Sequence, residues 1–556
     1  MKRQLYSTTL LAILCAAPLS AQDIYKVQQF SASDLNGDAR FVGMGGAMGA
    51  LGANISAMNT NPASVALYRR GDMSISGSKL SHLGNRDVAN YLGTSSRKGS
   101  LDQLGFIYPL FVNGESLKFV NLGFNYRKTH NFHNLINIDN ASLPTLSNPN
   151  AAHDGSPMAG ASQTWQLVDL ARTNQGFLDL DTKAGIEATS PMSALATDIR
   201  LLEPIRKENK VVGYEKTNAE AYHLRRATWG AIEAYDFNIS ANYNDRFYVG
   251  ANIGLYNLYY NTAAEYQELS LNNEGKYFTT QEGARKTYLM QHQQRVTGTG
   301  VDAKFGVLVR PLPESPFRIG LSLTTPIFYM LSANNYVYME SPVGGTIDGK
   351  YYDYIKKDAE RNYDYRMRTP WKVNVSLGTT IGRRLALGAE YEITDHLTGQ
   401  IRHLGNGYTN YDSSNGTIDK VQQPDINNML NDTHTLRVGA EMRFAPEWYG
   451  RVGYNFVSSP FSEKAFRRLY SDSPSLYNTM STDYVNLGET HRFTCGLGYR
   501  SSDYYVDFSY QYQTQKAEVY PFFYDTAGPA GNQNSIAGQN LDFNRSQLSL
   551  TIGYRF

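Results

Sequence analysis

The chain has 556 residues, of which 12% are aromatic, and it contains 48 glycines and 41 tyrosines. Its 52 basic residues nearly cancel its 51 acidic ones, so the charge gives no sign of nucleic-acid binding. No run approaches the about 20 apolar residues that a membrane helix needs, which excludes a polytopic helical membrane protein. The absence of long apolar runs does not exclude a transmembrane β-barrel, because alternating apolar and polar residues cancel in any hydropathy window.

Residues 1–21 have the pattern of a secretory signal peptide, with a basic start, an apolar core and small residues before the expected cleavage site. We therefore expect this stretch to be removed on export. Removal takes Cys15 away and leaves Cys495 alone, so no internal disulfide is predicted.

The next stretch, residues 22–71, shows no alternation and is rich in glycine, which permits tight turns and close backbone contact. Gly43-x-Gly45 lacks the third glycine of a dinucleotide-binding loop, so no nucleotide site is predicted. The run Asp34 to Asp38 has a hint of a calcium loop, but its glycine comes too early and no glutamate ligand follows at the right place. We interpret it as a polar turn, in a segment that can fold up into the lumen of a barrel.

From residue 72 onward, apolar and polar residues alternate in many short stretches, the pattern of strands with one apolar and one polar face. The clearest is the last, where Leu548, Leu550, Ile552, Tyr554 and Phe556 fall on one face. Residues 72–556 are therefore predicted to form an all-β, 14-stranded antiparallel transmembrane β-barrel, with apolar side chains toward lipid and polar ones toward the lumen. The strands are expected near 72–80, 101–111, 118–129, 229–243, 246–262, 287–310, 317–330, 368–381, 384–397, 433–445, 448–457, 489–500, 503–514 and 544–556.

Short and long connections alternate between these strands, as short periplasmic turns and long extracellular loops do in the Gram-negative outer membrane. We expect a multi-pass protein of the cell outer membrane, with both termini on the periplasmic side. The longest loop, about 130–228, is predicted to be partly helical, with helices that begin at Ser156-Pro157 and Ser190-Pro191. These helices either cover a hydrophobic groove or merely pack on each other.

Two features of the predicted lumenal face point to function. Gly123 lies in the middle of the third strand, where it either kinks the strand or makes room for the N-terminal segment. Inward basic residues either bind an acidic head group, because a guanidinium pairs well with a carboxylate, or form an ion-pair network that stiffens the wall. The head-group candidates are Lys304, Arg318, Arg437 and Arg451.

Several motifs, taken in order, resemble the FadL family of outer-membrane transporters for long-chain fatty acids and other hydrophobic compounds, in particular its Bacteroidetes-type members. They are Arg40–Ala47, Asn61-Pro62-Ala63, Gly300–Gly306, Thr324-Thr325-Pro326, Thr369–Asn374, Arg437–Glu441 and Gly496–Tyr499. The resemblance implies that residues 22–71 form a hatch, with Gly43, Gly45, Gly46, Asn61, Pro62 and Ala63 as its motif residues. It also implies capture of substrate at an extracellular groove and lateral release through a gap at a kinked third strand.

Two other functions stay open beside this channel, and a third is not expected. A hemin-binding receptor needs an axial ligand such as histidine, and His130-x-x-His133 is the one close histidine pair. A FadL-like partner protein of a secretion system is compatible with the long polar loops. An enzyme is not expected, because no catalytic triad stands at convincing spacing. We predict no metal and no cofactor, a monomer, and outer-membrane lipid and a hydrophobic small molecule as partners.

The alternation in the last strand makes a further prediction. Leu550→Arg is expected to destabilise the barrel by roughly 2–4 kcal/mol if position 550 lies at the bilayer midplane. Thr551→Arg, on the lumenal face, is expected to be tolerated.

Overall fold

The computed structural model describes most of the chain. It covers residues 24–556 except 83–89, 93, 96, 113, 115, 144–160, 174, 272–278, 280–284, 343–344, 348–349, 383, 404–416, 419–428, 464, 468, 470–475 and 526–533. The expected signal peptide and the predicted helix start at Ser156 lie outside the described residues.

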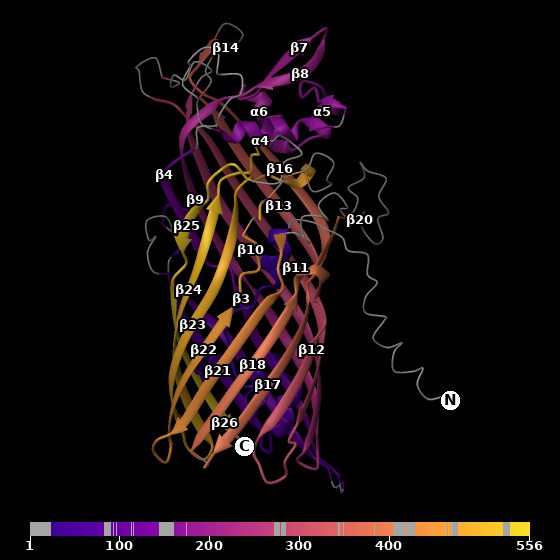
Figure 1. Ribbon diagram of the computed structural model, residues 1–556, viewed down its shortest axis with the longest axis vertical. Helices are drawn as coiled ribbons and strands as arrows, with labels where there is room; N and C mark the ends of the chain where they lie inside the picture. The colour runs from indigo at the N-terminus through magenta and orange to yellow at the C-terminus, as the bar shows by residue number, and fades with distance from the viewer. Residues whose placement is uncertain are drawn as a thin grey trace, which may run out of the picture.

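Fourteen antiparallel wall strands close into a barrel through pairing of the first with the last, from Asp72 opposite Arg555 onward, so the predicted fold class is confirmed (Figure 1). In several places one wall strand consists of two consecutive segments. The wall is built from β1 (Asp72–His82), β2 (Arg97–Phe111), β3 (Leu117–Asn131) with β4 (Asn134–Ser142), β9 (Asn218–Tyr243), β10 (Phe247–Leu271), β11 (Thr287–Val309), β12 (Arg318–Thr324) with β13 (Phe328–Ser341), β16 (Ile355–Arg368) with β17 (Trp371–Ile381), β18 (Leu385–Asp395) with β19 (Gln400–His403), β21 (Thr433–Arg443), β22 (Trp448–Val457), β23 (Tyr484–Arg500), β24 (Tyr504–Tyr520), and β25 (Gln539–Asp542) with β26 (Arg545–Arg555).

The remaining elements are short. Small strands pair as β5 (Arg172–Thr173) with β6 (Gly176–Phe177), β7 (Glu203–Lys207) with β8 (Lys210–Glu215), β14 (Gly345–Ile347) with β15 (Lys350–Tyr352), and β20 (Thr417–Ile418) with β19. The helices are α1 (Ile24–Ser31), α2 (Ala39–Gly43), η1 (Ser56–Asn59), η2 (Pro62–Leu67), α4 (Gln163–Leu170), α5 (Lys183–Glu187), α6 (Pro191–Asp198), η4 (His396–Thr398) and η5 (Leu476–Asn478). No helix among the described residues is long and apolar enough to cross a membrane.

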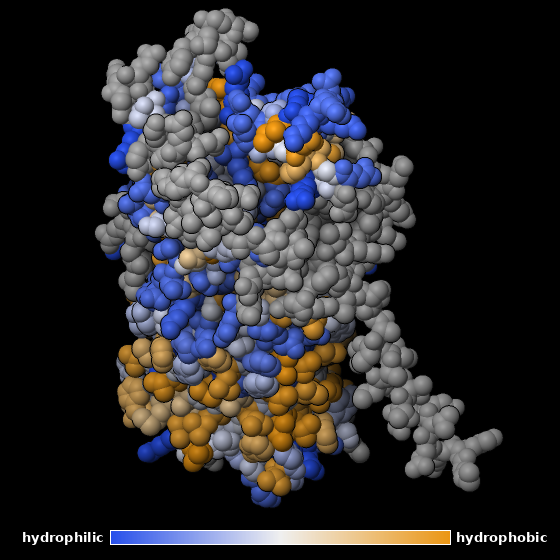
Figure 2. Space-filling view, turned by 45° about the horizontal axis from the view of Figure 1, so that its top comes forward, coloured by the Kyte–Doolittle hydropathy of each residue, from blue (hydrophilic) through white to orange (hydrophobic). Residues whose placement is uncertain are grey.

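The outer surface of the lower part of the barrel, as seen in Figure 2, carries a belt of exposed apolar side chains. Along β26, Leu548, Leu550 and Ile552 face outward, while the residues between them are buried toward the lumen. Beyond the belt, the outward positions are polar, as at Asp358 and Glu360 of β16. Alternation vanishes there, which is why several strands extend well past their predicted limits.

The two ends of the barrel differ. At the short-turn end, Asn244 and Asp245 link β9 to β10 with positive φ angles of 53° and 55°, the conformation that suits a tight hairpin. Gly71, which precedes β1, exchanges backbone hydrogen bonds with the C-terminal Phe556 at this same end. The long connections gather at the opposite end.

Residues 24–71, here called the N-terminal segment, lie inside the barrel (Figure 1). Asp38 caps α2 by accepting a hydrogen bond from Phe41 N, and Asn61 caps η2 by accepting one from Ala63 N. Asn61 also reaches the wall, because its Nδ2 donates to Val307 O at 3.3 Å. The segment is therefore held together by its own helix caps and contacts the inward faces of the strands.

Helices α4 and α6 close the lumen toward the long-connection end. Ser190 is the N-cap of α6, as predicted. The apolar residues that follow Ser190, which are Met192, Leu195, Ile199 and Leu202, are buried in a core with inward side chains of the wall strands, among them Tyr222, Tyr266 and Tyr288. The two helices contact each other, as one interpretation of this loop expects, and they also pack against the barrel interior. That they cover a hydrophobic groove stays a prediction.

The Leu550→Arg prediction gains support from the geometry, but its intended control does not. Leu550 is 39% exposed on the apolar belt, so Arg there is expected to cost roughly 2–4 kcal/mol of stability near the midplane, as measured by urea unfolding in lipid vesicles. Thr551 is fully buried, and its Oγ1 accepts a hydrogen bond from Ala39 N at 2.7 Å. Thr551→Arg must displace the N-terminal segment, so the expectation that it is tolerated is wrong.

A better control is Leu550→Ala, which shortens the side chain without adding charge. If both variants unfold at the same urea concentration, position 550 does not face lipid.

Candidate ligand cavity in the barrel lumen

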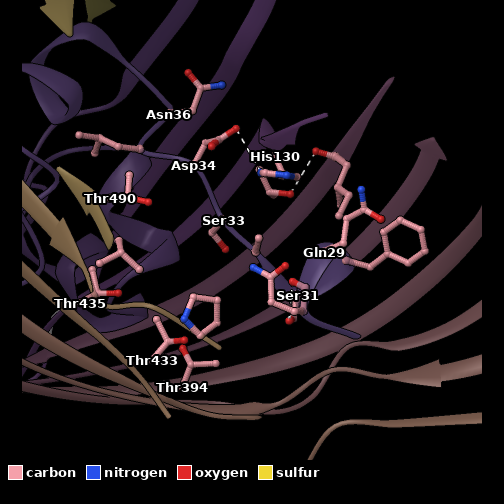
Figure 3. Close-up of a pocket in the computed structure, with 18 of the residues that line it drawn as sticks. Gln29, Ser31, Ser33, Asp34, Asn36, His130, Thr394, Thr433, Thr435 and Thr490 are labelled. Carbon is pink, nitrogen blue, oxygen red and sulfur yellow. Dashed lines mark hydrogen bonds and ion pairs between the residues drawn. The ribbon is translucent and has the colours of Figure 1, made fainter. Parts of the chain in front are cut away.

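A cavity of about 270 Å³ lies in the lumen between the N-terminal segment and the wall (Figure 3). Its floor includes Ser31, the last residue of α1, together with Ser33 and Asp34, which follow the helix. Its walls come from strands all around the barrel. The cavity is thus central in the lumen, above the bulk of the N-terminal segment and below the core around α4 and α6.

One side of the cavity is aromatic. Phe30 of α1 packs edge-on against Phe132, with ring centroids 5.7 Å apart, and Tyr256 packs edge-on against Tyr329 at 6.2 Å. These rings belong to one buried cluster that also contains Ile232. This side offers an apolar surface to a hydrophobic chain.

The other side is rich in hydroxyl groups and positive charge. Thr394, Thr433 and Thr435 stand side by side on neighbouring strands (Figure 3). Lys372 Nζ lies near them and donates to Ser31 O at 3.3 Å and to Ser33 Oγ at 3.2 Å. This side offers hydrogen-bond partners to a polar head group.

Basic side chains outnumber acidic ones on the described lining. The basic residues are Arg127, Lys304, Lys372, Arg437, Arg492 and Arg545, and the acidic ones are Asp34, Asp302 and Glu392. Two further carboxylates, Asp236 and Glu390, pair with lining residues from behind. Even with these two included, the charge around the cavity favours an anion.

Asp34 is the carboxylate that projects from the N-terminal segment into this cavity. It pairs with Arg545, lies 3.2 Å from His130 Nδ1 and lies 3.9 Å from Arg492 Nη2 (Figure 3 shows the His130 pair). Burial alone would raise the pKa of Asp34, but its contacts with Arg545, His130 and Arg492 hold it well below its usual range. Asp34 is therefore ionised at neutral pH and acts as an internal anion.

The four predicted head-group residues separate into two groups. Lys304 and Arg437 line the cavity, while Arg318 and Arg451 lie outside its lining. Lys304 Nζ is 3.2 Å from an Asp236 oxygen, and Arg437 is 3.1 Å from Glu392.

The two residues outside the lining also have internal partners. Arg318 donates to Leu51 O at 3.0 Å, and Arg451 pairs with Glu441 and Asp507. The ion-pair interpretation thus matches the contacts of Lys304, Arg437 and Arg451, whereas Arg318 contacts a backbone carbonyl. Binding of a head group by any of the four stays a prediction.

The motif residues of the N-terminal segment meet two different parts of the wall. A Cβ added at Gly45 would lie 2.8 Å from Tyr454 N, and the backbone at Pro62 lies against Gly250 of β10. The strand-kink candidate Gly123 lies in regular pairing with both neighbours, opposite Ile107 and Asn238.

The register shifts of β3 lie elsewhere, between Leu117 and Phe119 and between Lys128 and His130. A Cβ at Gly123 would lie 2.7 Å from Met58 Cε, so this glycine makes room for the N-terminal segment.

Sequence reasoning missed the Asp34 cluster. Residues 34–38 were interpreted as a polar turn, because the partners of Asp34, which are Arg545, Arg492 and His130, come from distant parts of the chain. The described residues contain no group of three or more His, Cys, Asp or Glu side chains that could hold a metal ion.

No protein-family model and no curated protein matches the chain. Three solved structures illustrate the likeness of fold. A FadL homologue of Pseudomonas aeruginosa is 13% identical, with a TM-score of 0.48, over 94% of this chain and 99% of that one. The CymD monoaromatic hydrocarbon channel is 12% identical, with a TM-score of 0.45, over 94% and 98%. The toluene transporter TodX of P. putida is 10% identical, with a TM-score of 0.44, over 94% and 99%. Each of these similarities extends over nearly the whole length of both chains.

Proposed function

We propose that the protein is a passive outer-membrane channel for hydrophobic or amphipathic compounds, with long-chain fatty acids as the default substrate. The observation that carries this proposal is the two-sided cavity, which pairs the aromatic wall of Phe30 and Phe132 with the cationic, hydroxyl-rich wall around Lys372. A hydrocarbon chain gains free energy by leaving water for the first wall, and an acidic head group pairs with the second.

In this proposal, substrate is captured at the long-connection end, which faces outside, and is released sideways through the barrel wall into the membrane. The N-terminal segment acts as a hatch that blocks a straight path to the short-turn end. Support for the hatch comes from the burial of this segment between the cavity and that end of the barrel. The substrate's own partitioning into lipid drives the movement, so no energy source is required.

The test is mass spectrometry of what co-purifies with the native protein in mild detergent, followed by oleate uptake in cells that lack their own fatty-acid channel. A bound fatty acid and uptake that depends on the protein support the proposal. A stoichiometric porphyrin with a Soret band points instead to the hemin receptor. An empty lumen without oleate uptake contradicts the channel and favours the partner-protein alternative.

A further inference from the structure

Three arginines lie together on the outer face of the barrel wall. Arg366 of β16 is directly opposite Arg402 of β19, and Arg368 is two residues further along β16. The alternate side chains of this strand, Tyr365 and Met367, are buried in a core inside the lumen, so the arginines between them point outward. Arg366, Arg368 and Arg402 are here called the arginine cluster.

The arginine cluster marks the border of the apolar belt. In the ladder between β16 and β13, Arg368 is opposite Phe328 and Arg366 is opposite Met330. Phe328 and Met330 are 53% and 63% exposed on the outer face. The next outward pair toward the long connections is polar, a serine opposite an aspartate. The cluster therefore lies where the apolar surface ends and the polar surface begins.

A tryptophan supports this placement. Trp371 of β17 follows the cluster on its short-turn side and shares the outer face of the strand with Val373, which is exposed on the belt. Tryptophan favours the boundary between lipid and water, because its ring is apolar and its N–H is polar. The outer surface thus passes from Val373 through Trp371 to the arginine cluster, as it would from lipid chains to head groups.

The charges of the arginine cluster lack a counter-ion in the described part of the chain. None of the three arginines forms an ion pair with a described residue. Asp364, on the same face of β16, instead accepts a hydrogen bond from Ser332 Oγ at 2.6 Å. Like charges directly opposite each other on neighbouring strands destabilise a sheet. An anion between Arg366 and Arg402 would remove this repulsion.

Arg368 contributes a donor that is not used. Its Nη2 donates to Thr398 O at 3.1 Å. Its Nε is buried and has no hydrogen-bond partner among the described residues. A buried donor without an acceptor is costly, so an acceptor that reaches this nitrogen stabilises the protein.

The chemistry of the cluster suits a phosphate that is attached to a lipid. Guanidinium groups present a planar fork of N–H donors that matches the oxygens of a phosphate. The acyl chains of such a lipid gain free energy against Phe328 and Met330 directly beside the cluster. A soluble phosphate gains nothing from those two side chains.

We propose that the arginine cluster binds the phosphate of a phosphorylated lipid in the outer leaflet of the membrane. The inference rests on the proposed channel function, in which the long-connection end faces outside, and it adds a lipid site on the outer wall. Lipid A, a glycolipid that carries phosphate groups and acyl chains, is the probe with this chemistry.

The first experiment measures lipid binding to the purified, unmodified protein by native mass spectrometry. The protein is mixed with lipid A or with lipid A whose phosphates have been removed, and inorganic phosphate is added as a competitor. We expect the dephosphorylated lipid to bind about tenfold more weakly or less, the loss of one strong hydrogen-bonded contact. Equal binding of the two lipids overturns the phosphate site. Displacement of lipid A by an equal concentration of inorganic phosphate overturns the lipid as the ligand.

The second experiment assigns the binding to the cluster. Arg366→Gln with Arg402→Gln removes the two facing charges. The matched control, Lys356→Gln with Lys357→Gln, removes the same charge from the far end of β16, where both lysines are exposed. We expect the arginine variant to bind lipid A about tenfold more weakly or less, while the control binds it like the unmodified protein. Equal binding by the two variants overturns the assignment.

A third measurement separates this inference from the channel function. Asn362 is exposed on the outer face beyond the cluster, so Asn362→Cys in a Cys495→Ala background shows which side of the membrane this end faces. We expect a membrane-impermeant maleimide to label it on intact cells. Labelling only after lysis overturns the assignment to the outer leaflet. If oleate uptake fails while lipid A still binds, the channel function is contradicted and the lipid site is supported.

Discussion

Replacing Glu441 with alanine is expected to destabilise the barrel by about 3–5 kcal/mol, the cost of breaking a buried ion pair by removing one partner. Glu441 binds Arg40 of the N-terminal segment at 2.7 Å and Arg451 of the wall at 2.6 Å. Its side chain is 7% exposed and that of Arg451 is fully buried. Without this carboxylate, Asp507 is left to balance the guanidinium groups of Arg40, Arg451 and Arg500.

Two measurements test this expectation. Urea unfolding in detergent or lipid gives the loss of stability, and trypsin cleavage after Arg40 shows whether α2 has come away from the wall. Asp503→Ala is the matched control, because Asp503 pairs with Arg70 at 2.9 Å where the side chains are 46% and 53% exposed. An exposed pair contributes about 1 kcal/mol or less, so this control should unfold almost like the unmodified protein. Equal effects of the two changes would show that the buried network does not anchor the N-terminal segment.

The barrel could be predicted from the sequence because each strand crosses the lipid with one apolar and one polar face. This signal is local, and it is as clear in Leu548, Leu550 and Ile552 as anywhere in the chain. It fails where both faces are polar. Strand β16 was missed almost entirely, because side chains such as Lys357 and Glu360 project into water above the apolar belt.

The interruptions of the wall strands were missed for another reason. Thr325-Pro326 and Thr369-Pro370 were used as family motifs, but each also removes a backbone donor from the ladder. The hydroxyl of Thr369 accepts from Ile327 N at 2.8 Å and so replaces part of the lost pairing. A proline inside a predicted strand was thus a signal of interruption that the alternation pattern concealed.

The candidate site depended on contacts that no local pattern contains. Asp34 and Arg545 are 511 positions apart, and they meet only because closing the barrel brings β26 beside the N-terminal segment. The inward arginines were visible in the sequence, but their partners were not. The positive charge of the lumenal side chains could therefore be predicted from the sequence. Whether each of them forms an ion pair or a ligand site could be decided only from the fold.

Gly45→Val is expected to displace the N-terminal segment from the wall and to open a larger pore. Gly45 has φ of 63°, and a Cβ there would lie 2.8 Å from Tyr454 N and 2.9 Å from Tyr454 O. The left-handed conformation alone costs a residue with a side chain about 1–2 kcal/mol. The clash adds to this cost, because its neighbours are backbone atoms of β22 that cannot rotate away.

Single-channel conductance in a planar bilayer measures the result, and we expect the variant to conduct ions where the unmodified barrel does not. Gly382→Val separates strain from clash, since Gly382 has a similar φ of 57° but nothing within 4 Å of its added Cβ. This control bears the conformational cost in the turn after β17 and leaves the lumen filled, so its conductance should stay low. If Gly45→Val stays closed as well, the segment tolerates the added side chain by a local shift, and close backbone contact at Gly45 is not what keeps the lumen sealed.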